Sequence, residues 1–342
     1  MKQAKQTLGI SLLLVGALFL LPLAVLRPEG KTPDRIAALP EETMSPPISR
    51  GEQDHNVILR VLHGDTVEEM DLGTYLTCVV RAEMPASFEE DALCAQAVAA
   101  RTYTMYKLQG GSNHTNADIC TDSTCCQAYM TKTEAQANWG TEAEENEAKI
   151  QRAVTDTDGQ VILYHGAPIL AVFHSCSAGQ TRGAGEVWQN DLPYLQPVSS
   201  PEPTDSIPNY YSRVEFTAKE FQEAVRQSCP QATFKGSMRS WLNNAVVDSA
   251  GNVETVDVGG VTVKGATLRG ILGLRSACFE WQIEGEQLVF YVTGYGHGVG
   301  LSQYGANRMA QEGYSWREIL THYYTDVSVE PYDLETGRNA LQ

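Results

Sequence analysis

The chain has 342 residues and a formal net charge of −17, with 42% apolar and 20% charged residues. This composition predicts a folded protein rather than a disordered one. The acidic balance argues against binding to a nucleic-acid backbone. No repeat recurs at a fixed period, which excludes collagen-like and solenoid folds. The sequence therefore predicts one or two acidic globular domains.

The N-terminus contains an uncharged run of 20 residues, 7–26, which is long enough to cross a bilayer as a helix. The run ends in Arg27-Pro28-Glu29 rather than in a small-residue cleavage site. We therefore expect residues 1–27 to be an uncleaved membrane anchor instead of a secretory signal. Basic residues before the span favour a cytoplasmic N-terminus, which would put the folded region outside the cytoplasm. Residues 28–55 are rich in proline and predict an extended linker.

Residues 56–335 mix both kinds of secondary structure without a regular alternation of strand and helix. Alternating apolar residues predict hairpins near 57–70 and 160–181, and further strands near 253–263 and 279–291. Helical spacing of apolar residues predicts helices from Leu72, from the Ser87–Glu90 capping box, over 216–225 and over 265–272. We expect an α+β fold with an N-terminal transmembrane helix, a tether and one catalytic region, followed by a tail at 336–342. Whether that region divides into two lobes around a cleft is left open.

Glu83 is the first candidate for chemistry. It continues the apolar stripe of the helix that begins at Leu72, and Pro85 ends that helix shortly afterwards. Desolvation of a carboxyl there would raise its pKa, as a general acid near neutral pH requires. By itself the pattern favours a structural buried Glu that is neutralised by Arg81, Arg101 or a backbone amide.

A glycine-rich run, GYGHGVGLSQYGANRMA, begins at Gly294. No Lys-Ser/Thr pair follows it, so it does not match a phosphate-binding loop. Glycines at this density permit tight turns of the backbone against a bound ligand, to which Gln303 would donate a hydrogen bond and Tyr304 offer a stacking face. His297 fits this groove or a core position equally well.

The segments VVRAEMPASFEEDALCAQAVAARTYTMY and GYGHGVGLSQYGANRMA together resemble the stage II sporulation protein D family of endospore-forming bacteria. That domain is shared with amidase enhancers, and the similarity extends over residues 56–330. The resemblance implies a lytic transglycosylase that acts on peptidoglycan glycan strands during engulfment, anchored in the mother-cell membrane facing the forespore. It also implies that the Glu of the AEMP motif, Glu83 here, is the catalytic acid.

A single essential carboxylate is compatible with this chemistry. Hydrolytic glycosidases usually use two carboxyl groups. In a lytic transglycosylase the muramic C6 hydroxyl is the nucleophile, so one Glu can protonate the glycosidic oxygen and then accept the hydroxyl proton. The product carries a 1,6-anhydro end, and no cofactor is needed for catalysis.

The loop HTNADICTDSTCC places four soft ligands within 13 residues: His114, Cys120, Cys125 and Cys126. Four such ligands would close a structural zinc site, whereas a disulfide from Cys120 to Cys125 or Cys126 is the competing interpretation. Some members of the resembled family have His-x5-Cys-x4-His-Cys in this loop, with Cys125 here replacing the second His. We favour Zn²⁺ in a structural role.

The segment FHSCSAGQT adds a further cluster of polar residues. Cys176 beside His174 would suit a thiol nucleophile, with His297 as another base, but no oxyanion partner can be named. We expect three other residues of this segment, Ser175, Ser177 and Gln180, to line a substrate groove. Arg101, His297, Gln303 and Tyr304 from the other motifs are expected to join them.

Three functions therefore remain: a lytic transglycosylase, a non-catalytic wall-binding amidase enhancer, and a Cys176-dependent peptidase of the stem peptides. The expected partners are peptidoglycan glycan strands. The resemblance adds stage II sporulation proteins P, an amidase, and M, an integral membrane protein. No nucleic-acid partner is expected.

Overall fold

The computed structural model describes residues 52–188 and 190–333, which combine helices with several small sheets. The α-helices among them are α2 (Glu52–His55), α3 (Leu72–Glu83), α4 (Glu90–Tyr106), α5 (Lys132–Trp139), α6 (Ala143–Asp156), α7 (Ala184–Val187), α8 (Ala218–Ser228), α9 (Gly265–Leu272), α10 (Gln303–Gln311) and α11 (Trp316–Tyr323). A π-helical turn, Lys107–Gly111, extends α4, and short 3₁₀ turns occupy Gly140–Glu142 and Met238–Ser240.

The strands form five small sheets, whose orders are β2-β1-β3, β14-β4-β5, β13-β6, β11-β12-β7 and β10-β9-β8. Their bounds are β1 (Ile58–His63), β2 (Thr66–Asp71), β3 (Ile119–Cys120), β4 (Gln160–Tyr164), β5 (Ala167–Pro168), β6 (Phe173–His174), β7 (Tyr211–Thr217), β8 (Leu242–Val247), β9 (Val253–Val258), β10 (Val261–Lys264), β11 (Phe279–Glu284), β12 (Gln287–Thr293), β13 (Leu301–Ser302) and β14 (Ser328–Pro331).

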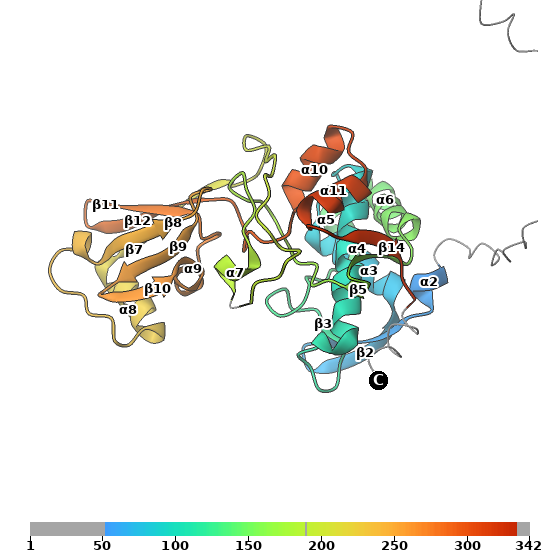
Figure 1. Cartoon of the computed structure of the whole chain (residues 1–342), viewed down its shortest axis with the longest axis horizontal. Helices are drawn as coiled ribbons and strands as arrows, with labels where there is room; N and C mark the ends of the chain where they lie inside the picture. Colours follow the sequence, from blue (N-terminus) through green and yellow to red (C-terminus); the bar gives the residue numbers. More distant parts are fainter. Residues whose placement is uncertain (1–51, 189, 334–342) are drawn as a thin grey trace, which may run out of the picture. The chain divides into compact units, whose positions relative to one another are not determined.

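The first hydrophobic core is built around α4, against which α3, α6, α10 and α11 pack (Figure 1). Alanine at many positions of α4 lets these neighbours approach closely, and most of the helix is buried. The apolar stripe that predicts α3 is fully buried. The Asp71 side chain caps α3 by accepting a hydrogen bond from the Thr74 amide at 2.9 Å.

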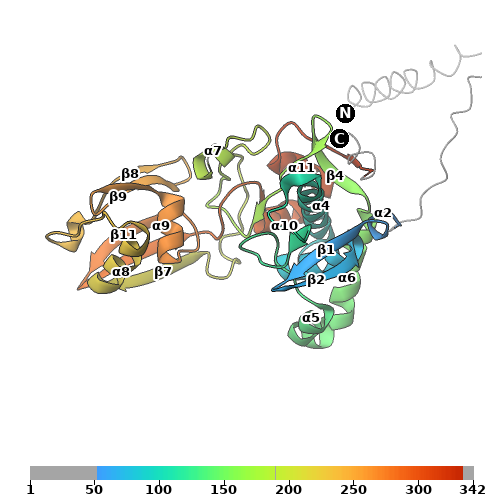
Figure 2. The ribbon, with the colours of Figure 1, turned by 90° about the horizontal axis from the view of Figure 1, so that it is seen from below.

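The second core belongs to the sheets β11-β12-β7 and β10-β9-β8 with helices α8 and α9 (Figure 2). Aromatic side chains fill it, with Phe221 of α8 in contact with Trp241 and Phe290. The described residues thus contain two large hydrophobic cores. A small third cluster of Cys176, Ile207 and Tyr210 lies on the segment between β6 and β7. The mixed α+β content that the sequence predicts is present.

Several local predictions change in detail. The Ser87–Glu90 capping box does not form, because Ser87 lies in a turn closed by the Phe88 amide and the Pro85 carbonyl. Instead, Asn307 of α10 accepts a hydrogen bond from the Glu89 amide at 2.8 Å just before α4 begins. The helix expected over 216–225 begins only at Ala218, because Tyr211–Thr217 pairs with β12 as a strand. The hairpin β4–β5 forms as expected, but β6 pairs in parallel with β13.

The predicted transmembrane part of the fold and the single-pass membrane localisation need correction. Over residues 52–188 and 190–333, no helix is both long and apolar enough to cross a membrane. The longest of these helices, α4, has 17 residues and includes Glu90, Asp91 and Arg101, whereas a span needs about 20 mostly apolar residues. The expected span, 7–26, the N-terminal part of the linker and the whole tail, 336–342, lie outside the described residues. We therefore assign neither an N-terminal anchor nor an extracytoplasmic location.

Candidate active site

Glu83 is the last residue of α3, and its carboxylate is held from two sides. Oε1 accepts a hydrogen bond from the Ala128 amide at 2.9 Å, and Oε2 accepts one from Gln303 Nε2 at 3.3 Å. Met84 is extended, as expected for a residue before proline, so the helix ends where the carboxyl group is needed. Residues from three distant parts of the sequence therefore meet at this carboxylate.

Burial raises the pKa of Glu83 above its ordinary value, and this effect exceeds the opposite pull of the Ala128 and Gln303 hydrogen bonds. A carboxyl group in such surroundings keeps its proton to higher pH than one in water. The environment thus favours a group that can donate a proton and afterwards carry a negative charge that two donors stabilise.

A cavity of about 870 Å³ opens beside Glu83. It is large enough for a sugar unit of a polymer, because ligand sites commonly measure about 300–1,000 Å³. Its walls come from α3, the 123–128 loop, the β6 segment, α9 and the glycine-rich run: Ala82, Glu83, Tyr103, Ser123, Thr124, Cys125, Cys126, Gln127, Ala128, Val172, Phe173, His174, Ser175, Trp188, Arg269, Tyr295, Gly296, His297 and Gln303. Glu83 and His297 therefore line one cavity.

Gln303 is the first residue of α10, and the start of that helix is fixed by several contacts. The Ser302 side chain caps α10 by accepting from the Gly305 amide, and Ser302 also lies opposite His174 in the β13–β6 ladder. The Gln303 amide group donates to Gln96 Oε1 at 3.3 Å as well as to Glu83. The motif LSQYG thus places a donor against the acid with little freedom to move.

The glycine-rich run brings backbone close to β6. At Gly296, whose φ is +123°, a Cβ would lie 2.6 Å from the Cβ of His174. At Gly300, with φ of +69°, a Cβ would lie 2.2 Å from the Val172 carbonyl oxygen. Any other residue would separate the two segments, so these glycines are required for the cavity wall.

His297 and His174 lie side by side in this wall, with ring centroids 5.6 Å apart. Burial lowers the pKa of His297 to about 4 and that of His174 to about 3. Both imidazoles are therefore neutral near pH 7, and neither supplies a positive charge to the site.

The other predicted groove residues divide into two groups. Ser175 lines the cavity, as do His297 and Gln303. Four residues make internal contacts instead. Arg101 is fully buried and paired with Asp54, Ser177 donates to Glu202 at 2.7 Å, Gln180 accepts from Ser249 at 2.9 Å, and Tyr304 packs edge-on against Phe88. These four side chains are not among those that line the cavity.

Sequence reasoning missed Glu202 and Trp188. Glu202 Oε1 accepts hydrogen bonds from the hydroxyls of Ser177, Ser200 and Ser302 and from the Ser177 amide, at 2.6–3.0 Å. This carboxylate joins the segment after β6 to the start of α10. Trp188 lines the cavity next to His297. Neither residue stands in a recognisable motif, and both are brought to the site by a long irregular segment.

Cys176 does not have the surroundings of a nucleophile. Burial and, to a smaller extent, the neighbouring Glu202 carboxylate raise the pKa of its thiol to about 11. Its backbone pairs with Tyr295, and its side chain does not line the cavity. A thiolate is the reactive form of cysteine, so this environment gives no support to the peptidase hypothesis.

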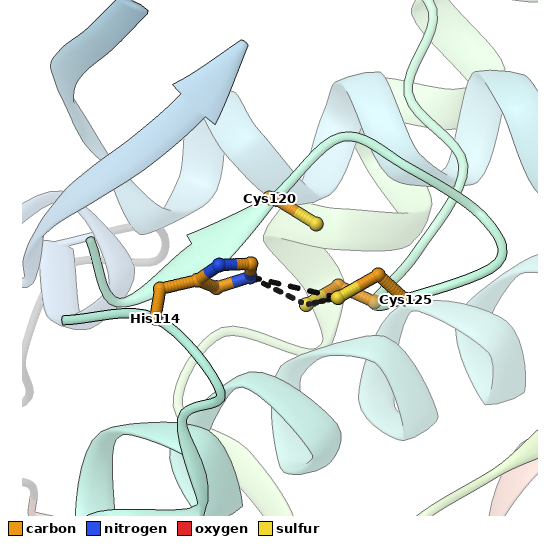
Figure 3. A group of neighbouring side chains, drawn as sticks. His114, Cys120 and Cys125 are labelled. Carbon is orange, nitrogen blue, oxygen red and sulfur yellow. Dashed lines mark hydrogen bonds between the residues drawn. The ribbon is translucent and has the colours of Figure 1, made fainter. Parts of the chain in front are cut away.

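The four predicted metal ligands lie together (Figure 3), and two of them, Cys125 and Cys126, also line the cavity. Their ligand atoms are all within 4.8 Å of one another. His114 Nε2 is 3.7 Å from Cys125 Sγ and 3.6 Å from Cys126 Sγ, and the two sulfurs are 3.9 Å apart. A tetrahedral zinc site with Zn–S bonds of about 2.3 Å would separate its ligand atoms by about 3.5–3.8 Å. The donor set therefore fits zinc, and the spacing of His114, Cys125 and Cys126 is close to that of such a site. All eight cysteines of the described chain are free thiols.

Comparison with known proteins identifies the family. A family model described as "Stage II sporulation protein" matches residues 63–164. A stage II sporulation protein D from Bacillus subtilis is 37% identical over 78% of this chain and 77% of its own length. The chain belongs to the stage II sporulation protein D family. The corresponding protein of Bacillus amyloliquefaciens is 36% identical over 78% of the chain and 76% of its own length.

A more distant relative carries a different description. The "Amidase enhancer" of Bacillus subtilis is 26% identical over 74% of this chain and 40% of its own length. The predicted relationship to both groups of proteins is thereby confirmed. The family places the protein in sporulation.

Proposed function

We propose that this protein is a lytic transglycosylase of peptidoglycan glycan strands, and that it remodels septal wall during engulfment. The observation that carries the proposal is a carboxyl group of raised pKa at the wall of a cavity that is large enough for a sugar unit. The family resemblance supplies the substrate, and the position of Glu83 supports the chemistry.

In this mechanism Glu83 protonates the oxygen that links MurNAc C1 to GlcNAc, and the C1–O bond breaks. The C6 hydroxyl of the same MurNAc attacks C1, and its proton passes to the Glu83 carboxylate. The products are a 1,6-anhydro-MurNAc end and a new GlcNAc end. No water is consumed, and Glu83 returns to its protonated form. The Ala128 amide and Gln303 stabilise the carboxylate while it carries charge.

A structural zinc ion is part of the proposal. His114, Cys120, Cys125 and Cys126 would hold it, and it would fix the 114–126 loop, whose next residues include Gln127 and the Glu83 partner Ala128. Because four protein ligands complete a tetrahedron, the ion would leave no position for a catalytic water. Its contribution would be to stabilise the loop.

The test is digestion of purified glycan strands followed by mass analysis of the products. We expect anhydro ends from the native chain and none from Glu83→Gln. Glu90→Gln is a matched control, because Glu90 begins α4 on the surface and pairs with Arg152. Ordinary reducing ends would refute the mechanism, and full activity of Glu83→Gln would refute the assignment of the acid.

A second candidate function rests on the amidase-enhancer relative. In that case the cavity would bind glycan strands without cleaving them and would present them to an amidase. Strand binding without any product at high protein concentration would favour it. The partners that the resemblance implies, stage II sporulation proteins P and M, remain predictions for either function.

A further inference from the structure

A group of side chains that the proposed chemistry does not use lines the same cavity as Glu83. It consists of Trp188, His297 and His174, whose rings stand in a row. The ring centroids of Trp188 and His297 are 5.4 Å apart, and those of His297 and His174 are 5.6 Å apart. The row provides apolar ring surface next to polar nitrogen atoms, which is the combination that sugar sites commonly use.

One ring nitrogen of His297 is held within the protein. Its Nδ1 accepts from the Val299 amide at 3.1 Å, so the proton of the neutral ring lies on Nε2. His297 therefore presents no free acceptor nitrogen to a ligand.

His174 differs from His297 in which ring nitrogen carries the proton. Its Nδ1 lies 3.2 Å from the Val299 carbonyl oxygen, which can only accept, so the ring proton must be on Nδ1. Nε2 is then a bare acceptor, and it is buried without a hydrogen-bond partner. The whole residue is only 4% exposed, so bulk solvent does not satisfy this atom.

An unpaired acceptor in such a place costs stability unless something donates to it. Burial lowers the pKa of His174 to about 3, so the ring does not relieve the cost by binding a proton near neutral pH. Glycine at 296 lets the backbone pass directly against His174, where any side chain would clash. The position of His174 is therefore fixed by the fold.

We propose that this row is a sugar subsite of the cavity, in which His174 Nε2 accepts a hydrogen bond from an N–H or O–H group of the glycan and Trp188 packs against the sugar ring. The inference rests on the proposed function, because the cavity must take glycan. His174 is then a specificity-determining residue. The acetamido N–H of an N-acetylated sugar and a ring hydroxyl are the two sources of the donor.

Binding in the absence of turnover tests the subsite. The full chain carrying Glu83→Gln is titrated calorimetrically with chitotetraose and with cellotetraose, which has hydroxyls in place of the acetamido groups. His174→Asn keeps an N–H near the Val299 carbonyl but removes the Nε2 acceptor. We expect it to weaken chitotetraose binding about tenfold. His174→Gln restores an acceptor near that position and should recover most of the affinity.

The two sugars separate the two sources of the donor. If His174→Asn loses affinity for chitotetraose alone, the donor is the acetamido N–H. If it loses affinity equally for both sugars, the donor is a ring hydroxyl. Unchanged affinity of His174→Asn for both sugars overturns the subsite. If substitution of the buried His174 prevents folding, the affinities of Trp188→Ala and Trp188→Phe test the subsite instead. Only the first should lose affinity, and wild-type affinity in both overturns the proposal.

The proposed function can fail separately. A native chain that binds chitotetraose through His174 but yields no anhydro ends from glycan strands would leave the subsite standing and remove the transglycosylase. If neither sugar binds, the subsite is overturned, and anhydro ends from the native chain would then leave the transglycosylase standing.

Discussion

Gln303 Nε2 donates to Glu83 Oε2 over 3.3 Å, although the two residues are 220 positions apart in the sequence. One is the first residue of α10 and the other is the last residue of α3. The contact joins the two motifs that carry the family resemblance. It also opposes the effect of burial, since it lowers a pKa that desolvation raises.

The first prediction concerns the pH profile. Gln303→Leu removes a hydrogen bond that lowers the pKa of Glu83, so the pKa should rise further. Because the first step needs the protonated acid, activity should extend to higher pH, while the maximal rate falls because the carboxylate is less stabilised. Rates of anhydro-end formation from pH 4 to 9 measure both effects. Gln311→Leu, at the exposed end of the same helix, is the control, and an unshifted profile in Gln303→Leu would contradict the argument.

The second prediction concerns stability. A carboxyl whose folded pKa lies above its unfolded value binds more protons in the folded state, so its contribution to folding is lost as pH rises through the raised pKa. Glu83→Gln removes this loss. Its melting temperature should exceed that of the native chain by a few degrees near pH 7, and the difference should shrink at pH 4. Thermal unfolding at the two pH values gives the answer. If Glu83→Gln were less stable than the native chain at both pH values, hydrogen bonds would fully compensate the cost of burying the Glu83 carboxylate.

The third prediction concerns metal. Protein purified without chelator should contain one zinc per chain by elemental analysis, and removal of the metal should lower the melting temperature. Cys125→Ser and His114→Ala should lose zinc. Cys278→Ser is the control, because Cys278 lies outside the cluster and its thiol contacts the Ala250 carbonyl. A chain without zinc that shows a Cys120 disulfide in a peptide map would favour the competing interpretation.

The fourth prediction concerns the Glu202 carboxylate. Ser302→Ala removes both the cap of α10 and a 2.6 Å hydrogen bond to Glu202, and should destabilise the fold by about 1–3 kcal/mol. Glu202→Gln weakens the same network, so the two effects should not add in a double-mutant cycle. Denaturant unfolding measures both. Ser315→Ala, which removes the cap of the exposed start of α11, is the matched control. Additive effects would show that Glu202 does not stabilise the start of α10 through Ser302.

The fifth prediction concerns Arg101. Its guanidinium is fully buried and donates to Asp54 of α2 at 2.6 and 2.8 Å. Arg101→Met should leave a buried carboxylate unpaired and cost about 3–5 kcal/mol of folding free energy. Arg60→Met, which breaks the half-exposed pair with Asp118, should have a much smaller effect. Urea unfolding compares the two. A stable Arg101→Met variant with weakened glycan binding would instead support the predicted role of Arg101 in the substrate groove.

The sequence alone predicts the candidate acid, the candidate metal ligands and the two motifs, because local patterns encode them. The stripe from Leu72 predicts α3, and Pro85 predicts its end, so Glu83 is found at a helix terminus. Four soft ligands within 13 residues are already close in the chain. Both inferences depend on residues that are near neighbours in sequence.

Tertiary structure decides which polar side chains reach the cavity. Arg101 and Ser177 resemble groove residues in sequence, yet each meets a carboxylate from a distant segment, Asp54 or Glu202. The acceptor on His174 is invisible without the Val299 carbonyl that fixes its proton. Such partners lie more than 20 residues away, and their encounter depends on packing of the whole chain, which no local periodicity records.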